Sequence, residues 1–172
     1  MVNAQARLLN KPALIEYQNM KFLISDAPSD SNLALYIAEF EQHNVKDVVR
    51  VCDPTYVTSP LDNLGIKVHD WPFGDGEGPP PAIIREWLEL VKSRFGKDQG
   101  ENPPCAIAVH CVAGLGRAPL LVALALIEAG MTQEDSIAYL RERRRGVLNS
   151  KQSKFILDYK RKKSRKGKCT IM

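Results

Sequence analysis

Cys111 and Arg117 lie six positions apart in this chain, with Gly114 and Gly116 between them. Glycines allow a backbone to take positive φ values and to turn its N–H groups inward, which makes a binding site for an anion. The guanidinium of Arg117 is planar, and two of its donors match two oxygens of a phosphate. Such a positive field favours the nucleophilic thiolate form of a cysteine. The four residues therefore predict a loop that binds a phosphoryl group and transfers it to Cys111.

Apolar runs on both sides of this loop predict the elements that position it. Residues 106–109 are typical of a buried strand and residues 120–126 of a helix, so the order is strand, tight loop, helix. The helix directs the positive end of its dipole at the loop. The alternative for Cys111 is a small buried hydrophobic residue at a strand end, against which the glycines and Arg117 argue. The expected phosphate-binding residues are Val112, Ala113, Gly114, Leu115, Gly116 and Arg117.

A leaving tyrosyl or seryl oxygen needs a proton, and Asp75 is the candidate donor. It lies between two glycines and four residues after Trp71, in a segment flexible enough to close over a substrate. The alternative is an aspartate in an ordinary Asp-Gly turn. Asp70, directly before Trp71, is expected instead to end a strand or to pair with a base.

A second cysteine, Cys52, ends a predicted strand over residues 47–52. Neighbouring strands of a parallel sheet finish at a common edge. Cys52 and Cys111 are therefore candidates for a redox disulfide, provided that their Cα atoms lie within about 7 Å. A reactive thiolate with a resolving thiol nearby is the arrangement of a redox sensor. Cys105, inside an apolar run, is expected in the core.

The 172 residues suit one domain, and the apolar (44%) and charged (26%) fractions are ordinary for a globular protein. The net charge of +4 is uneven, because residues 160–172 hold seven Lys or Arg and no acid, whereas the rest holds 17 basic and 20 acidic residues. We find neither a transmembrane stretch nor a signal sequence. Four cysteines then favour reactive or modified thiols over structural disulfides. We expect no cofactor and no metal.

Hydrophobic periodicity predicts strands that alternate with helices, and hence a single α/β domain with a central, mostly parallel sheet flanked by helices. The expected strands are 17–25, 47–52, 66–70 and 105–109, and the expected helices begin near residues 33, 81, 117, 133 and 150. Capping patterns, Thr132 with Asp135 and Asn149 with Gln152, precede the last two helices, and the final helix is expected to run toward Lys163.

Three segments together closely resemble the phosphatases of regenerating liver, the prenylated (PRL, type IVA) family of protein tyrosine phosphatases. They are residues 110–119, the Trp-Pro-Phe-Gly-Asp-Gly of residues 71–76 and the Cys-Thr-Ile-Met of residues 169–172. The resemblance covers residues 17–172. It implies a dual-specificity-type phosphatase fold, hydrolysis of phosphate monoesters such as protein phosphotyrosine through a phosphocysteine, and a reversible disulfide between Cys52 and Cys111.

Two positions depart from the family pattern. Family members usually carry two adjacent acids where this chain has Gly74 and Asp75, which leaves Asp75 as the general acid. Most tyrosine phosphatases carry Ser or Thr at the position of Ala118, where a hydroxyl stabilises the cysteine sulfur as a leaving group. Alanine lacks that hydroxyl, so the phosphocysteine is expected to hydrolyse slowly. His110 is expected either to hold the shape of the loop or to be a satisfied structural residue.

The last four residues match a C-a-a-X box in which Cys169 is lipidated, and the terminal Met172 favours farnesyl. One lipid chain gives only marginal membrane residence, and the basic residues add roughly 1 kcal/mol each near an anionic leaflet. The expected location is therefore the cytoplasmic face of the plasma membrane or endomembranes. The alternative for the basic run is nuclear import or nucleic-acid binding, but beside the box no nucleic acid is expected.

The predicted domain limits are an N-terminal extension (1–16), a phosphatase domain (17–159) and a polybasic tail (160–172). Two functions stay open for them. The first is a phosphatase that uses Cys111, Arg117 and Asp75. The second is a membrane-anchored binding module, because the resemblance implies a partner among magnesium transporters whose acidic loop the pocket grips. Ala118 keeps this second function open, since it slows turnover without harming the pocket. The resemblance also implies homo-oligomers, because related proteins can form trimers.

Overall fold

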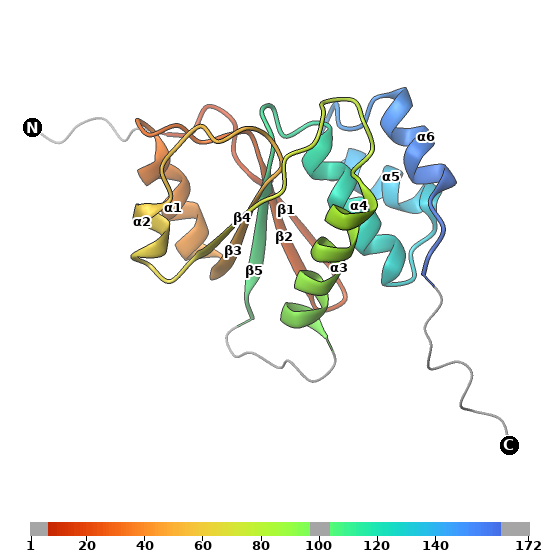
Figure 1. The fold of residues 1–172 in the computed structure, drawn as a ribbon, viewed down its shortest axis with the longest axis horizontal. Helices are drawn as coiled ribbons and strands as arrows, with labels where there is room; N and C mark the ends of the chain where they lie inside the picture. The colour runs from red at the N-terminus through yellow and green to blue at the C-terminus, as the bar shows by residue number, and fades with distance from the viewer. Residues whose placement is uncertain (1–6, 97–103, 163–172) are drawn as a thin grey trace, which may run out of the picture.

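The computed structural model describes residues 7–96 and 104–162, whose centre is a five-stranded sheet (Figure 1). The strands are β1 (Ala13–Tyr17), β2 (Met20–Ser25), β3 (Val45–Arg50), β4 (Lys67–Asp70) and β5 (Ala106–His110). Their order in the sheet is β1-β2-β5-β3-β4. Only the β1–β2 pair is antiparallel among the pairs of the described strands. The mostly parallel sheet expected from the sequence is confirmed.

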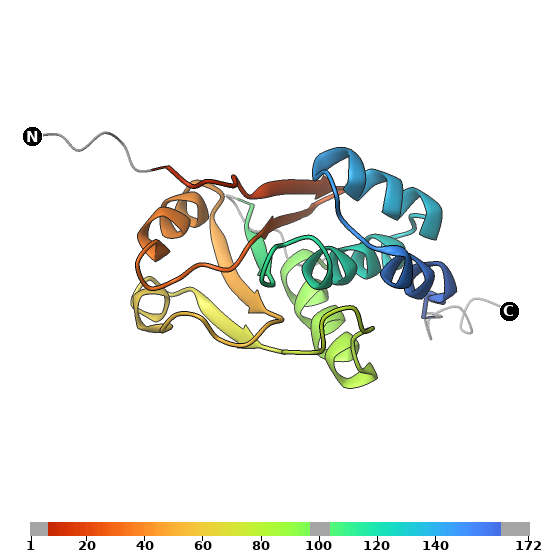
Figure 2. The same ribbon diagram turned by 90° about the horizontal axis from the view of Figure 1, so that it is seen from above.

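Helices lie on both sides of the sheet (Figure 2). One side carries α1 (Leu33–Gln42) and α2 (Ser59–Asp62), and the other carries α3 (Pro81–Phe95), α4 (Arg117–Glu128), α5 (Gln133–Arg143) and α6 (Ser150–Asp158). In β5, Ala106 and Ala108 pack into the hydrophobic cluster on the side of α1 and α2, whereas Ile107 and Val109 pack into the cluster on the side of α3 to α6. A strand buried on both faces reads as a continuous apolar run, which is why β5 was predictable.

Helix α4 is buried along nearly its whole length, from Arg117 to Ile127. It packs against α3, α5, α6 and strands β2 and β5, so it has no solvent-facing side. A helix that is apolar all round is expected in such a position. Burial fixes the first turn of α4, and with it Arg117, relative to the end of β5. None of the helices in the described ranges is long and apolar enough to cross a membrane.

Three elements differ from the predictions. The single strand predicted over residues 17–25 is wrong, because Gln18 takes a φ of 53° and turns the chain between β1 and β2. The short helix α2 was not predicted. The last helix ends at Asp158 and does not run toward Lys163, because the Tyr159 carbonyl accepts a hydrogen bond from Gln133 Nε2 (2.7 Å) and its hydroxyl donates to Glu128 (2.7 Å). Residues 163–172, with Cys169, lie outside the described residues.

Candidate active site

A cavity of about 300 Å³ lies at the carboxyl end of β5. It brings together the three residues that the sequence singled out for chemistry, Cys111, Arg117 and Asp75. Three further residues, Gly146, Asn149 and Gln152, reach it from the segment between α5 and α6 and from α6 itself. The lining residues are Asp75, Cys111, Val112, Ala113, Leu115, Gly116, Arg117, Gly146, Asn149 and Gln152.

The backbone carbonyls of residues 112–115 all accept hydrogen bonds from outside the loop. Val112 O accepts from Ala27 N (2.9 Å) and Leu115 O from Leu148 N (2.7 Å). The Arg144 guanidinium donates to the two between them, through Nε to Gly114 O (2.8 Å) and through Nη2 to Ala113 O (3.3 Å). In a trans peptide the N–H points away from the C=O. Because the carbonyls face outward, the loop presents its N–H groups inward, as an anion site requires.

Two glycines of the loop are required by close approach of other atoms. Gly114 has a φ of +70°, and a Cβ on it would lie 2.5 Å from the carbonyl oxygen of Ser25. A Cβ on Gly116 would lie 2.5 Å from Nε2 of Gln152. Gly114 therefore takes the positive φ expected of it, whereas Gly116 has a φ of −128° and instead leaves room for the Gln152 side chain of α6.

Arg117 connects the loop to the segment that carries Asp75. Its Nη1 donates to the carbonyl oxygens of Phe73 (3.0 Å) and, more weakly, of Val51 (3.4 Å). Its Nε is buried and has no hydrogen-bond partner in the described residues, and the Asp75 carboxylate is 3.8 Å away. A buried donor without an acceptor is rare in a folded protein. Here it lies at the cavity, where a phosphate oxygen would satisfy it.

Asp75 is the exposed member of the site, with 81% of its side chain accessible, whereas Phe73 in the same segment is buried. Backbone hydrogen bonds from Trp71 to Arg50 (2.9 Å) and from Phe73 to Val51 (3.4 Å) attach the start of the segment to β3 and the residue after it. Phe73 and Arg117 thus anchor the segment while the Asp75 carboxyl stays at the open side of the cavity. That position suits a proton donor to a leaving group that enters from solvent.

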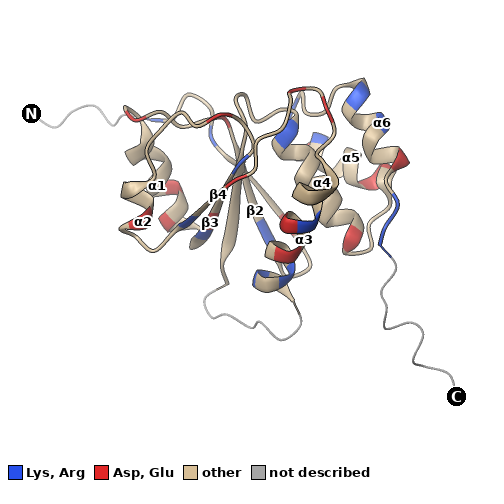
Figure 3. Cartoon of the chain, viewed as in Figure 1, with Lys and Arg blue, Asp and Glu red and all other residues tan. Residues whose placement is uncertain are grey.

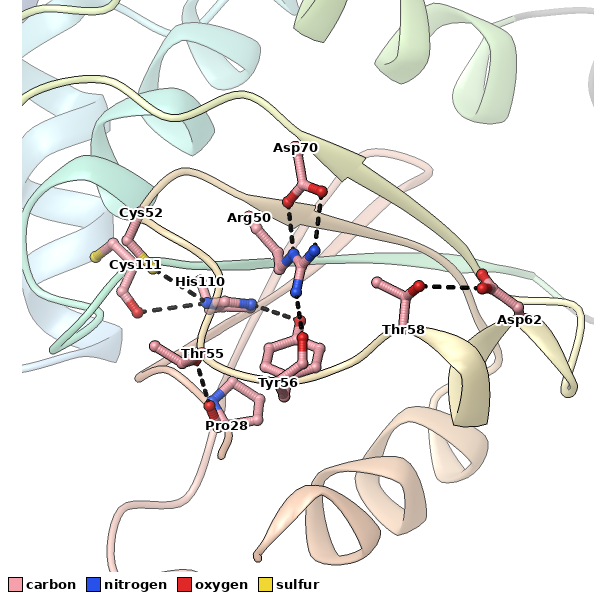
Figure 4. Close-up of polar contacts among 10 residues, drawn as sticks. All are labelled: Pro28, Arg50, Cys52, Thr55, Tyr56, Thr58, Asp62, Asp70, His110 and Cys111. Atoms are coloured by element: carbon pink, nitrogen blue, oxygen red, sulfur yellow. Dashed lines mark hydrogen bonds and ion pairs between the residues drawn. The ribbon is translucent and has the colours of Figure 1, made fainter. Parts of the chain in front are cut away.

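Behind the nucleophile, a chain of polar contacts runs from β5 to β4 (Figure 4). His110 Nε2 lies 2.7 Å from the Tyr56 hydroxyl, and Arg50 Nη1 donates to the Tyr56 carbonyl oxygen (2.8 Å). Arg50 also makes a bidentate ion pair with Asp70 (2.5 and 2.8 Å). The pKa of Asp70 is lowered by these hydrogen bonds, and burial lowers the pKa of His110 to about 4. Asp70 therefore pairs with a base and is also the last residue of β4, so both of its expected roles are observed. His110 is a neutral structural residue at neutral pH.

Cys52 lies two residues beyond the end of β3, and not at its last residue as predicted. Neither Cys52 nor Cys111 forms a disulfide in this structure, and both are buried. The Cys52 sulfur is 4.0 Å from His110 Nδ1. Burial raises the pKa of the Cys52 thiol, and the nearby Cys111 raises it further. Cys105 is also buried, directly before β5 and hence at the opposite end of that strand from Cys111.

Sequence reasoning missed two residues that shape the site, Arg144 and Gln152. The capping pattern of Asn149 and Gln152 was recognised and is present in full, but nothing in it indicated that α6 begins beside the loop. Of the other predicted capping box, only the Thr132 side chain as acceptor from Asp135 N is observed. Arg144 gave no signal in a run of three arginines, Arg143 to Arg145.

The fold and the site define a cysteine-dependent phosphatase, and solved structures agree with this. A protein tyrosine phosphatase from Leishmania major is 45% identical and matches with a TM-score of 0.78, covering 87% of this chain and 99% of that chain. The phosphatase Tk-PTP in its active form has the same fold, with a TM-score of 0.68 at 18% identity, over 87% of this chain and 95% of its own. No protein-family model matches the chain.

The chain belongs to the type IVA, or PRL, family of protein tyrosine phosphatases. It is 49% identical to the PRL-1 phosphatase of Drosophila melanogaster, over 97% of this chain and 96% of the relative. It is 46% identical to the protein tyrosine phosphatase type IVA 3 of Bos taurus, over 95% of this chain and 98% of the relative. The family resemblance read from the three segments is thus confirmed, and the protein is a cysteine-dependent tyrosine phosphatase.

Proposed function

We propose that Cys111 attacks the phosphorus of a phosphotyrosyl residue in a protein, forming a phosphocysteine that water then hydrolyses. Arg117 and the N–H groups of residues 112–117 hold the phosphoryl oxygens, and Asp75 protonates the leaving tyrosyl oxygen. The observation that carries this assignment is the buried Nε of Arg117, which lacks a partner at a cavity it shares with Cys111. The outward carbonyls of the loop support it.

Rapid-mixing kinetics of an aryl phosphate with the fully reduced protein test these roles. Phenol release is expected as a burst equal to the enzyme concentration, followed by a slow steady rate. Cys111→Ser is expected to abolish the burst, because the hydroxyl is a far weaker nucleophile than the thiolate. Asp75→Asn is expected to slow the burst by about 100-fold, the usual contribution of a general acid. A burst that survives Cys111→Ser contradicts the assignment.

The same site is proposed to be regulated by peroxide. The Cys111 thiolate attacks one peroxide oxygen, forming a sulfenic acid and releasing hydroxide, and the Cys52 sulfur then attacks the sulfenic sulfur and releases water. Two observations support this proposal. The two thiols follow β3 and β5, and these strands are direct neighbours in the sheet. Cys111 also raises the pKa of the Cys52 thiol. After hydrogen peroxide and then dithiothreitol, wild type is expected to recover full activity. Cys52→Ser is expected to lose activity irreversibly, and equal recovery of both contradicts the disulfide.

A membrane address is proposed for the tail, with farnesyl on Cys169 and the basic residues of positions 160–168 against anionic lipid. It places the enzyme on the cytoplasmic face of the plasma membrane or of endomembranes. The support is the sequence of residues 160–172 alone, because residues 163–172 lie outside the described part of the chain.

A second function, as a binding module, is favoured by the same unpartnered donor of Arg117, because a carboxylate satisfies it as well as a phosphate does. The proposed partner is a magnesium transporter that inserts an acidic loop into the cavity, and homo-oligomers would multiply that contact. In a Cys111→Ser background, Arg117→Ala is expected to abolish transporter binding. Unchanged binding excludes the cavity as the docking site.

A further inference from the structure

Gln152, at the third position of α6, is 97% buried. It lies beside residues 112–117, the phosphate loop. Its backbone N–H donates to Asn149 Oδ1 (2.8 Å), and its side-chain oxygen Oε1 accepts from the backbone N–H of Asn149 (3.0 Å). This reciprocal capping box fixes the orientation of the Gln152 side-chain amide, with its oxygen toward Asn149. Because Oε1 is engaged by Asn149, the amide nitrogen Nε2 is turned away from the cap.

Nε2 of Gln152 points toward the phosphate loop. It is the atom that a Cβ on Gly116 would approach to 2.5 Å, and Gln152 lines the same cavity as Cys111 and Arg117. Within residues 7–96 and 104–162, Nε2 makes no hydrogen bond, and it is not one of the fully buried side-chain atoms that lack a partner, so it keeps accessible surface. Gln152 is a buried residue at the cavity that Cys111 and Arg117 also line, so an amide donor that the fold leaves unpaired there indicates a ligand oxygen as its partner.

We propose that Gln152 is a further catalytic residue, whose Nε2 donates a hydrogen bond to a non-bridging phosphoryl oxygen in the bound substrate and in the phosphocysteine. The inference rests on the proposed function, because the phosphoryl group must occupy the cavity. Gln152 and Arg117 Nε then supply two side-chain donors from α6 and α4, whose N-terminal ends both lie at the end of the molecule where β5 finishes (Figure 1). The capping box holds Gln152 in place before substrate arrives.

Gln152→Glu separates this role from capping. Glutamate is as good a capping-box residue as glutamine, so its Oε1 still accepts from Asn149 and α6 still begins at Ser150. The atom that replaces Nε2, however, is an oxygen that cannot donate and repels an anion. Ser150→Glu is the matched control, because it adds the same charge at the exposed first position of α6 without facing the cavity. The probe is orthovanadate, titrated calorimetrically into the reduced full-length protein.

Gln152→Glu is expected to weaken vanadate binding by about tenfold or more, which is typical of a lost charge-assisted hydrogen bond. Its melting temperature is expected to stay at the wild-type value. The vanadate affinity of Ser150→Glu is also expected to equal that of wild type. Equal affinities in all three proteins, or equal weakening in the two variants, overturns the inference while leaving the phosphate site intact. If wild type itself fails to bind vanadate, the proposed site fails and Gln152 has no role there.

A measurement on wild type alone covers the case in which Gln152→Glu does not fold. The side-chain amide of Gln152 is followed by ¹H–¹⁵N correlation spectra of the labelled protein as vanadate is added. Its two N–H resonances are expected to shift and to gain protection from exchange. Constant Gln152 resonances, while the backbone amides of residues 112–117 shift, would show that the anion binds without Gln152 and would overturn the inference.

Discussion

Ala118 follows Arg117 and is fully buried in the first turn of α4. A hydroxyl at this position would donate to the Cys111 sulfur and lower the energy of the thiolate as it leaves phosphorus. We expect its absence to slow the second chemical step and to leave the first unchanged. A substitution at this one residue should therefore change hydrolysis of the phosphocysteine without changing its formation.

Ala118→Ser is expected to raise the steady rate of aryl phosphate hydrolysis about tenfold, because one hydrogen bond to a developing charge contributes roughly 1.5–3 kcal/mol. The size of the first-turnover burst is expected to stay at one per enzyme. Comparison of the burst phase with the steady phase in one rapid-mixing record measures both quantities. An unchanged steady rate would show that hydrolysis is limited elsewhere.

His110 makes stability depend on pH in a defined window. Burial lowers its pKa to about 4, whereas an unfolded histidine titrates near 6.5. Between these values the unfolded chain binds the extra proton, so stability is lost as pH falls from about 6.5 to 4, by about 3 kcal/mol for this group. Urea unfolding at pH 7.5 and pH 4.5 measures the loss. His110→Gln is expected to remove most of the difference, and a variant as pH-sensitive as wild type would contradict the assignment.

Among the elements, the phosphate loop depends most on the segment after α5. Arg144 holds two of its carbonyls, and the backbone of Leu148 holds a third. The Arg144 guanidinium suits this task because its donors lie in a fixed planar fork, which a lysine lacks. The loop is thus shaped by a segment about 30 residues further along the chain, although its own glycines permit that shape.

Arg144→Ala is expected to lower kcat/KM for an aryl phosphate by about tenfold, since Ala113 and Gly114 lose their shared donor and the loop N–H groups lose their fixed direction. Arg143→Ala is the matched control, because Arg143 leaves the same helix end but donates to Tyr139 O (3.0 Å) and contacts the Tyr139 ring. It removes the same charge without touching the loop. Equal losses in both variants would attribute the effect to charge alone.

At the scale of the whole molecule, the site and the start of the tail lie apart. The cavity is at the carboxyl edge of the sheet. The basic tail starts at the end of α6, close to the carboxyl end of α4 (Figure 3). There the backbone N–H of Lys162 donates to the Glu128 carboxylate (3.0 Å). Acidic side chains outnumber basic ones in residues 1–159, so the tail carries the excess positive charge. If the tail binds a membrane as proposed, we expect the cavity to stay free to meet substrates.

The farnesylated full-length protein is expected to bind vesicles of phosphatidylcholine with 30% phosphatidylserine at least tenfold more tightly than pure phosphatidylcholine. Raising the salt from 0.1 M to 0.5 M is expected to remove this preference, because it screens the tail charges. Cys169→Ser, which cannot be prenylated, is the control and is expected to stay in solution. Binding of Cys169→Ser equal to wild type would contradict the lipid anchor.

The sequence alone was enough to predict the centre of this protein. Strand β5, the loop from Cys111 to Arg117 and helix α4 are contiguous, and their order depends on local periodicity and on glycines whose conformational freedom is intrinsic. Asp75 was also identified by its own neighbours. The family resemblance rested on the same short segments, and the relatives confirmed it.

Tertiary structure decided the contacts between distant segments. The bonds of Arg144 to the loop, the turn of Gln152 Nε2 toward Gly116 and the Arg50–Asp70 pair join residues 20 to 36 positions apart. Side-chain types do not determine such contacts, because each depends on how helices and strands pack. The turn at Gln18 was missed for the same reason, since its neighbour Asn19 bonds to Phe95 O (2.6 Å) at the end of α3. Local sequence thus set the reacting groups, and packing set the partners that hold them.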